Sequence, residues 1–419
     1  MEKLIIKGKK TLNGSIKISG SKNATLPILA ATILSNKKIT LKNVPLVKDV
    51  FTMIDLLKFI GINVKIEKKK NFLEIVNKKN VLQTVAPYNL LKTMRAGVLV
   101  LGPLLAKYKK AKVSLPGGCA IGTRPIDLHL FALEKLGAKI KIKNGYIHAT
   151  AKNGLVGNNI VFPSVSVGAT ENAILASVSA KGRTIISNCA IEPEIQDMIF
   201  FLKKMGCKIK FLGKRKLLIN GSDYFKNVNH EIIFDRIELG TYIIAAALVG
   251  KKIKLLNINP KIINTEIKFL KRMGVRIKIK KDSIIILKTK SVKKVNIKTE
   301  PYPGFPTDLQ AQIMVLMTKA NGVSQIKENI FENRFMHVSE LKRMGARIKI
   351  RNNTAFISGP SNLSVAEVMA TDLRASVSLV LAGLVAENRT LINRVYHLDR
   401  GYENLEKKLT KCKADIKRV

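Results

Sequence analysis

The amino-acid sequence predicts an α/β protein of two domains, each built from three copies of a repeat of about 70 residues. Three observations carry this prediction. A helix–strand pattern recurs along all 419 residues, a second pattern of apolar helix and strand recurs between its copies, and the last repeat lacks a strand that the N-terminus could supply. Repetition at a fixed period dictates the architecture, so it is considered before single motifs.

The first pattern is a helix, a glycine and an alternating strand, as in Leu341-Lys-Arg-Met-Gly-Ala-Arg-Ile-Lys-Ile350. A glycine just past a helix end supplies the positive φ of a C-terminal cap. Alternation of apolar and charged residues after it is typical of a half-buried strand. A sixth, degenerate copy closes the chain at residues 409–419, with Lys413 in place of the glycine. The five glycines are Gly61, Gly137, Gly206, Gly274 and Gly345.

The second pattern is a helix rich in Ala, Leu and Val, a turn at Gly or Lys, and a short strand. These helices are apolar nearly all round, so we expect them to be buried. Four segments show the pattern clearly, residues 26–43, 173–188, 241–257 and 375–393, and residues 98–115 and 313–326 are looser versions of it.

The two ends of the chain complement each other. A second strand follows each of the first five copies of the first pattern, but the sixth copy stops at Val419 without one. Residues 4–9 form a strand with no repeat of its own, so the simplest closure lets them complete the last repeat. We therefore expect one domain over residues 22–229 and a second over residues 1–21 and 230–419, with the ligand site in the cleft between them.

The composition is that of a globular protein, with 46% hydrophobic and 25% charged residues. No apolar run approaches the roughly 20 residues of a membrane span, and the N-terminus alternates like a strand, unlike a signal peptide. The four cysteines, Cys119, Cys189, Cys207 and Cys412, have neither paired nor metal-type spacing. This favours a reduced, cytoplasmic environment, and the spacing of the five histidines does not indicate a metal site.

A formal net charge of +45 is typical of proteins that bind nucleic acid. Here, however, the lysines are scattered through every segment, and isoleucine and asparagine are abundant as well. This pattern favours codon bias towards A and T acting on solvated positions. Aromatic residues make up only 5% of the chain, whereas proteins that bind single strands stack bases on aromatic rings. We expect no nucleic-acid partner, although a basic surface attracts anionic small molecules.

Several of the predicted buried helices begin with a cation: Lys22, Arg95, Arg236 and Arg374. Helix N-termini favour anions, so a cation there opposes the helix dipole. Capping explains Thr170, Thr307 and Thr371 but not these cations. They indicate a multiply anionic substrate. Nucleotide hydrolysis and dinucleotide redox chemistry are disfavoured, because the phosphate-binding glycine motifs of those enzymes are absent from the sequence.

Cys119 lies in a glycine-rich loop, Pro116-Gly-Gly-Cys-Ala-Ile-Gly-Thr-Arg124. Glycines allow positive φ and close approach to a ligand, and nearby positive charge favours the thiolate. A small residue buried in a loop would be the ordinary explanation for a lone cysteine. The polar cluster of Arg124, Asp127 and His129 beside it favours a functional one.

At this point the motifs resemble those of the enolpyruvyl transferases, and among them the members whose acceptor is UDP-N-acetylglucosamine. The resemblance covers essentially the full chain. Its motifs are Gly20-Ser-Lys-Asn-Ala24, Lys92-Thr-Met-Arg-Ala96, residues 115–129, Val165-Ser-Val-Gly-Ala-Thr170, Phe305-Pro-Thr-Asp308, Phe331-Glu-Asn-Arg-Phe-Met-His337, Ala370-Thr-Asp-Leu-Arg374 and Leu398-Asp-Arg-Gly-Tyr402.

The resemblance implies an inside-out α/β barrel pair, in which each domain has three βαβαββ units with helices inside and sheets outside. It also implies a reaction without metal or other cofactor. The enolpyruvyl group of phosphoenolpyruvate moves to the 3-hydroxyl of UDP-N-acetylglucosamine, and phosphate leaves, by addition and then elimination. This would be the first committed step of peptidoglycan synthesis, and the thiol would be the target of the epoxide fosfomycin.

The resemblance further implies roles for individual residues. Cys119 matches the general acid, and Asp308 matches the residue that hydrogen-bonds the attacking hydroxyl and acts as base. Lys22, Arg124 and Arg400 match the cations that hold phosphoenolpyruvate. The other matched positions are Asn23 for the intermediate, Asp372 and Arg374 near the phosphate, and Arg95, Pro125, Ile126, Asp127, Leu128, Ser166, Val167, Gly168 and Ile330 around the nucleotide sugar.

Two alternatives remain open besides nucleic-acid binding. A shikimate 3-phosphate enolpyruvyl transferase would share Lys22 and the arginines, but it does not need the Pro-Gly-Gly-Cys loop. An inactive scaffold protein is disfavoured, because every motif residue is present.

Overall fold

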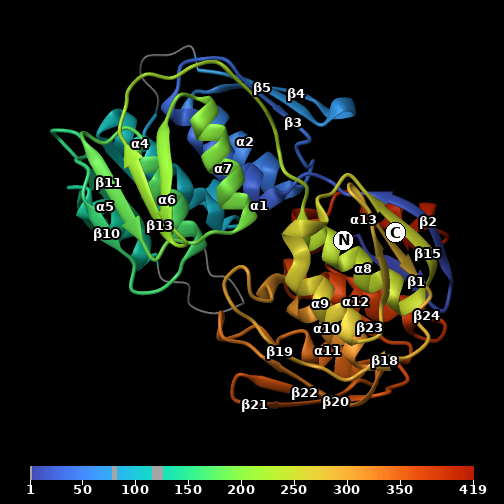
Figure 1. The fold of residues 1–419 in the computed structure, drawn as a ribbon. Coiled ribbons are helices and arrows are strands. Elements are labelled where there is room, and N and C mark those ends of the chain that lie inside the picture. The colour runs from blue at the N-terminus through green and yellow to red at the C-terminus, as the bar shows by residue number, and fades with distance from the viewer. Residues whose placement is uncertain (1, 78–82, 116–125) are drawn as a thin grey trace. The chain divides into compact units, whose positions relative to one another are not determined.

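The computed structural model describes residues 2–77, 83–115 and 126–419, and among them it contains two compact units. The middle unit holds the described residues between 20 and 233. The terminal unit holds residues 2–19 and 234–419, and therefore both ends of the chain. Figure 1 shows both units, each with its helices inside and its sheets outside.

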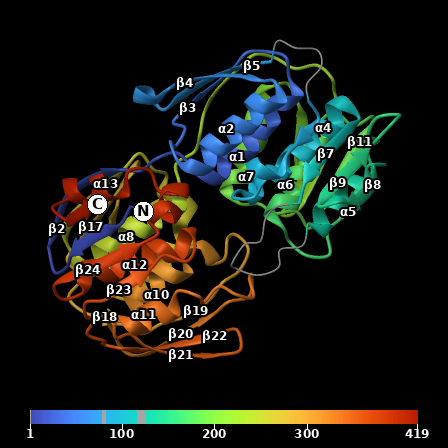
Figure 2. The ribbon, with the colours of Figure 1, turned by 180° about the vertical axis from the view of Figure 1, so that it is seen from behind.

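Three small sheets cover the middle unit, as Figure 2 shows from behind. In strand order, they are β14 (Val228–Glu231), β3 (Ile39–Lys42), β5 (Phe72–Val76) and β4 (Asn63–Glu67); β6 (Val85–Ala86), β7 (Lys110–Ser114), β9 (Tyr146–Thr150) and β8 (Lys139–Lys143); and β10 (Asn159–Val161), β11 (Arg183–Ser187), β13 (Lys216–Asn220) and β12 (Lys208–Gly213).

Three sheets of the same kind cover the terminal unit. They are β2 (Leu12–Lys17), β15 (Gly250–Leu256), β17 (Ser283–Leu287) and β16 (Arg276–Ile279); β18 (Val292–Lys293), β20 (Ala320–Lys327), β22 (Thr354–Gly359) and β21 (Arg347–Arg351), with β19 (Asn296–Lys298) also on β20; and β23 (Glu367–Met369), β24 (Arg389–Asn393), β1 (Leu4–Lys7) and β25 (Asp415–Arg418).

All six sheets share one topology. The first strand is parallel to the second, and each later neighbour is antiparallel, as in β10, β11, β13 and β12. A parallel pair needs a crossover, and a buried helix makes it, as α6 (Val167–Ser177) does between β10 and β11. The predicted α/β fold with repeating units is therefore confirmed.

The N-terminal strand completes the last sheet, as the sequence predicted. Strand β1 lies between β24 and β25 and pairs antiparallel with both, so that Ile6 faces Thr390 on one side and Ile416 on the other. The edge strands β2 and β14 are exchanged: β2 leads into β3 but pairs with β15, whereas β14 leads into β15 but pairs with β3. The chain passes from one unit to the other after each of these two strands.

The predicted apolar helices form the interior of each unit. Every residue of α10 is buried, and α8, α10 and α12 pack against one another. The segment predicted at residues 98–115 is less regular than expected, because a 3-10 helix at Arg95–Val100 precedes α4. The inner helices are α1 (Lys22–Ala31), α4 (Leu101–Tyr108) and α6 in the middle unit, and α8 (Arg236–Val249), α10 (Gln310–Met317) and α12 (Leu373–Val385) in the terminal unit.

The remaining helices are short or amphipathic. No helix in the described part of the chain combines the length and apolar character needed to cross a bilayer. These helices are α2 (Lys48–Ile60), α3 (Tyr88–Leu91), α5 (Asp127–Lys135), α7 (Pro193–Lys204), α9 (Asn264–Arg272), α11 (Val338–Arg343) and α13 (Leu405–Lys411), with 3-10 turns at Thr32–Leu34, Lys68–Lys70, Pro260–Ile263, Thr307–Leu309 and Val395–Arg400.

The repeat glycines have the left-handed backbone that the sequence predicted. Gly345 has φ of 92° after α11, and the Ala346 N–H closes the turn on the Leu341 carbonyl. Lys413, which replaces the glycine in the sixth copy, has φ of 74° after α13, and the Ala414 N–H bonds Leu409 in the same way. A side chain in this region costs roughly 1–2 kcal/mol.

Replacing Lys413 with glycine should therefore raise the thermal midpoint of the terminal unit, with about 0.5–1 kcal/mol of added stability, because glycine relieves the left-handed strain. Differential scanning calorimetry measures this. The matched control is Lys411→Gly at the last residue of α13, where glycine should cost up to about 1 kcal/mol. A lower midpoint for Lys413→Gly would show that the lysine side chain itself stabilises the turn.

Candidate active site

The predicted site residues fall in both units. Cys119, Arg124 and Pro125 lie outside the described residues. The middle unit carries Lys22, Asn23, Arg95, Ile126, Asp127, Leu128, Ser166, Val167 and Gly168, and the terminal unit carries Asp308, Ile330, Asp372, Arg374 and Arg400.

Lys22 begins helix α1, and the Ser21 side chain caps that helix by accepting from the Ala24 N–H at 3.3 Å. The Lys22 ammonium lies 3.3 Å from Asp49 Oδ2, and both side chains are buried. A buried charge needs a partner, and Asp49 supplies one. Asn23 follows in the first turn and is only partly buried.

Two of the other three helix-start cations also meet carboxylates of their own unit. Arg236 Nη1 lies 3.5 Å from Glu266 Oε1, and Arg374 Nε lies 3.3 Å from Asp308 Oδ2. Sequence reasoning assigned the neutralising anion to the substrate alone. The structure corrects this: at Lys22, Arg236 and Arg374 the chain provides at least one counter-charge itself.

Three element starts meet around His129 in the middle unit. The His129 ring fills the space beside Gly168, since a Cβ there would lie 3.0 Å from its Cε1 atom. Asn172 of α6 bonds the ring: its Nδ2 lies 3.2 Å from His129 Nδ1 and also donates to the Val98 carbonyl. These contacts join the start of α5, the start of α6 and the 3-10 helix that begins at Arg95.

His129 is held as a neutral imidazole. Burial, and then the nearby Arg95 charge, lower the pKa of His129 to about 4. The Asn172 amide orientation is fixed because its Oδ1 accepts from the Gly102 N–H at 2.8 Å, so Nδ2 donates to His129 Nδ1. Nε2 therefore carries the ring proton and is the remaining donor.

Three of the predicted nucleotide-sugar positions, Ser166, Val167 and Gly168, lie at the start of α6. Ser166 caps α6 by accepting from the Ala169 N–H at 3.3 Å, Val167 is the first helical residue, and Gly168 faces His129. Thr170, expected to be a cap, lies inside α6 and accepts from the Ala190 N–H.

The start of α5 is exposed. Asp127 is its first residue and points to solvent, Leu128 is partly buried, and Ile126 is buried. Free backbone N–H groups at a helix start suit an anionic ligand.

Asp308 forms a cluster with Arg334 and Arg374 in the terminal unit, called the Asp308 cluster below. Arg334 Nη2 donates to Asp308 Oδ1 at 2.7 Å, and Arg374 Nε donates to Oδ2 at 3.3 Å. Both arginines are buried, whereas the Asp308 side chain is 26% exposed. The carboxylate is thus fixed by two charge-assisted contacts and still open to a ligand.

The start of α12 holds the next two predicted residues. Asp372 caps the helix, with Oδ1 accepting from Arg374 N at 2.7 Å and Ala375 N at 2.9 Å, so the expected capping role of Thr371 belongs to Asp372. Burial tends to lower the pKa of Arg374, but Asp308 and Tyr402 raise it above its ordinary value. Arg374 Nη1 and Nη2 are buried and make no geometrically regular hydrogen bond to a described residue, although the Tyr402 side chain lies near the guanidinium. These two donors suit an anion.

Arg400 ends the 3-10 turn Val395–Arg400, which packs on α12. Burial, and then the Arg400 charge, lower the pKa of His397. On the other side, burial is the main cause that lowers the pKa of His337 to about 4, and Arg334 contributes. His337 and His397 are therefore neutral at pH 7, whereas Arg374 is charged.

Sequence reasoning missed Arg334. Arg334 is part of the motif at residues 331–337, but no spacing in the sequence indicated that it reaches Asp308, 26 residues away. The ring of Phe331 supports it, since the guanidinium lies 5.4 Å from the ring centroid.

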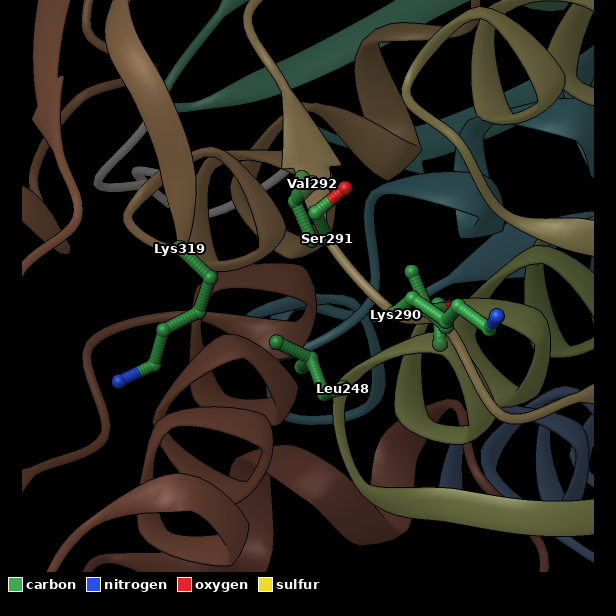
Figure 3. A pocket seen from close by; sticks show the side chains of 7 residues that line it. Leu248, Lys290, Ser291, Val292 and Lys319 are labelled. Carbon is green, nitrogen blue, oxygen red and sulfur yellow. The ribbon is translucent and has the colours of Figure 1, made fainter.

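A small hollow of about 230 Å³ lies elsewhere in the terminal unit, near the end of α8. Figure 3 shows Lys290 and Lys319 extending in opposite directions, away from Ser291 and Val292. The Lys319 amine points away from the hollow and donates to the Ser361 carbonyl at 2.9 Å. None of the predicted site residues lines this hollow.

The fold is similar to that of solved transferases, among them the enolpyruvyl transferase NikO from Streptomyces tendae. That structure matches with a TM-score of 0.88 and 23% identity over 100% of this chain and 99% of its own. EPSP synthase from Acinetobacter baumannii matches with a TM-score of 0.77 and 17% identity over the same shares. At such identities the likeness establishes the fold.

Residues 6–409 match the family of EPSP synthase (3-phosphoshikimate 1-carboxyvinyltransferase), and this chain belongs to that family. Among its curated relatives, a UDP-N-acetylglucosamine 1-carboxyvinyltransferase of Pelagibacter ubique is 61% identical over 100% of both chains. The protein of the same name from Rickettsia akari is 51% identical, again over 100% of both. The predicted membership among the enolpyruvyl transferases is confirmed.

Proposed function

We propose that this chain transfers the enolpyruvyl group of phosphoenolpyruvate to the 3-hydroxyl of UDP-N-acetylglucosamine and releases phosphate. The observation that carries the proposal is Asp308, a carboxylate held by Arg334 and Arg374 yet open on one side. Such a group can orient a hydroxyl and accept its proton. The names of the full-length relatives, at 61% and 51% identity, favour the nucleotide sugar over shikimate 3-phosphate as acceptor.

The reaction has two steps, an addition and an elimination. In the addition, the acceptor oxygen bonds to C2 of phosphoenolpyruvate, the hydroxyl proton passes to Asp308, and Cys119 donates a proton to C3, which becomes a methyl group. In the elimination, C3 loses a proton to the Cys119 thiolate, the C2–C3 double bond forms again, and the bond from C2 to the phosphate oxygen breaks, while the departing phosphate takes up the proton held by Asp308. The products are the enolpyruvyl ether and inorganic phosphate.

The cations hold the negative charge of phosphoenolpyruvate and of the departing phosphate. We assign this role to Lys22, Arg124, Arg374 and Arg400, with Asp372 holding the start of α12. Asn23 would bond the tetrahedral intermediate. Arg95, Pro125, Ile126, Asp127, Leu128, Ser166, Val167, Gly168 and Ile330 would surround the nucleotide sugar. We place the reaction in the cytoplasm, as the cysteine pattern predicts.

Choice of acceptor tests the proposal against its alternative. Phosphate release from phosphoenolpyruvate should be fast with UDP-N-acetylglucosamine and at background with shikimate 3-phosphate. Release with shikimate 3-phosphate alone would replace the proposal with the alternative, and no release with either would reject both.

Lys22→Ala should weaken phosphoenolpyruvate binding much more than UDP-N-acetylglucosamine binding. One charge-assisted contact is worth about 1.5–3 kcal/mol, or roughly 10- to 150-fold in Kd. Isothermal titration with each substrate measures the effect. Because Asp49 loses its buried partner, the control is Asp49→Asn, alone and combined with Lys22→Ala. Equal losses for the two substrates would mean that Lys22 acts only through Asp49 and the fold.

A further inference from the structure

Glu328 is a buried carboxylate beside the Asp308 cluster, and it takes no part in the proposed reaction steps. It follows the last residue of β20 and is only 3% exposed. A buried carboxylate is costly unless donors surround it, so its partners indicate what it does.

Four donors surround the Glu328 carboxylate. Oε2 accepts from the Thr307 hydroxyl at 2.9 Å. Oε1 accepts from the Thr299 hydroxyl at 2.9 Å, the Ile330 N–H at 2.9 Å and the Phe331 N–H at 3.2 Å. The carboxylate thus ties together three segments of the terminal unit that are separate along the chain.

Two of those segments hold the Asp308 cluster in place. Thr307 immediately precedes Asp308 in one 3-10 turn, and Phe331 lies under the Arg334 guanidinium, which bonds Asp308 in turn. The contacts therefore close a circuit that runs from Glu328 through Thr307, Asp308, Arg334 and Phe331 back to Glu328. Glu328 thus fixes both the turn that holds Asp308, the proposed base, and Phe331, whose ring supports Arg334.

The same carboxylate also fixes Ile330, which by its family resemblance is predicted to lie beside the nucleotide sugar. Glu328 sets the spacing between Asp308 and the Ile330 backbone, because it bonds the residue next to Asp308 with one oxygen and Ile330 N with the other. A shift of either segment would move the acceptor hydroxyl relative to its base, and small misplacements cost large factors in rate.

We propose that Glu328 is a positioning residue for the acceptor: it sets where the sugar hydroxyl lies relative to Asp308 and touches no reacting atom itself. The proposal rests on the proposed function. It differs from a purely structural role, because it concerns one substrate and not the stability of the whole unit.

Substitutions at both ends of the link test the proposal. Glu328→Gln keeps the size of the side chain but removes its charge and replaces one accepting oxygen with an NH2 group, so the side chain can no longer accept from all four donors. Thr307→Val cuts only the link towards Asp308 and leaves the bond to Ile330 N. Thr307→Ser keeps the hydroxyl and should therefore keep the wild-type kcat that Thr307→Val loses. The control is Glu387→Gln, an exposed carboxylate paired with Lys9 beyond the C-terminal end of α12.

The measurements are kcat, the KM for each substrate, and the thermal midpoint. For Glu328→Gln we expect the KM for UDP-N-acetylglucosamine to rise ~10-fold and kcat to fall ~10-fold, the size of one or two lost charge-assisted bonds, with the KM for phosphoenolpyruvate within about 2-fold. Thr307→Val should mainly lower kcat, about 5- to 10-fold. Thr307→Ser and Glu387→Gln should stay within about 2-fold of wild type.

Two results would overturn the proposal. One is wild-type kinetics in Glu328→Gln and Thr307→Val with a lowered thermal midpoint, which makes the carboxylate purely structural. The other is an equal rise in KM for both substrates. Wild-type activity with UDP-N-acetylglucosamine is measured in the same experiment, and its absence would count against the proposed function itself.

Discussion

Asp308→Asn is expected to lower kcat by about 10²- to 10⁴-fold while the protein stays folded, because general-base catalysis contributes a factor of this size. The amide keeps the shape of the side chain and one oxygen that can accept from Arg334 or Arg374. It cannot take the proton of the acceptor hydroxyl. Phosphate release at saturating substrates measures the loss.

The variant has a matched control in the same unit. Glu406 is also paired with an arginine, Arg418, at 3.1 Å, and Glu406→Gln removes the same kind of charge away from the predicted site. It should leave kcat within about 2-fold, since exposed or partly exposed ion pairs contribute little. If Asp308→Asn kept wild-type kcat, Asp308 would be a holder of Arg334 and Arg374 and not the base.

Cys119→Ser is expected to lower kcat strongly and to abolish covalent labelling by fosfomycin. Burial, the main cause, raises the pKa of Cys189 to about 11 and that of Cys207 to about 12, and it raises the pKa of Cys412 as well. All three are buried, so at pH 7 they are poor nucleophiles. The remaining cysteine, Cys119, should carry the label.

Peptide mass spectrometry of the fosfomycin-treated protein locates the label. Cys119→Asp is the informative companion, because a carboxylic acid can also donate a proton: it should keep activity and resist fosfomycin. A label on Cys189, Cys207 or Cys412 in the folded protein would contradict the assignment of Cys119.

Much of the fold followed from the sequence because repetition is a local signal. Gly345 and the alternating strand after it are neighbours in the chain, and the structure gives the glycine the expected positive φ. The missing strand after residue 418 was equally visible, and β1 fills its place. The break before α4 was not predicted, because the apolar pattern continues through Arg95–Val100 and does not distinguish a 3-10 helix from an α-helix.

The site was less accessible to sequence reasoning, because its contacts join distant segments. Helix-start cations were visible as a pattern, but their partners Asp49, Glu266 and Asp308 were not. Thr371 was expected to cap α12, but the helix begins at Leu373, so the cap is Asp372. A shift of one residue in the start of a helix changes which side chain caps it, and the sequence does not fix that start so closely. Glu328 lies in a stretch without any repeat signal, and only its four donors single it out.

The most direct test of enolpyruvyl transfer is the mass of the nucleotide-sugar product formed from phosphoenolpyruvate and UDP-N-acetylglucosamine in D₂O. The account requires UDP-N-acetylglucosamine enlarged by one enolpyruvyl unit, one phosphate released per product, and deuterium in the vinyl methylene, because C3 gains and then loses a proton. A phosphorylated sugar, or phosphoenolpyruvate hydrolysed to pyruvate with the sugar unchanged, would contradict it.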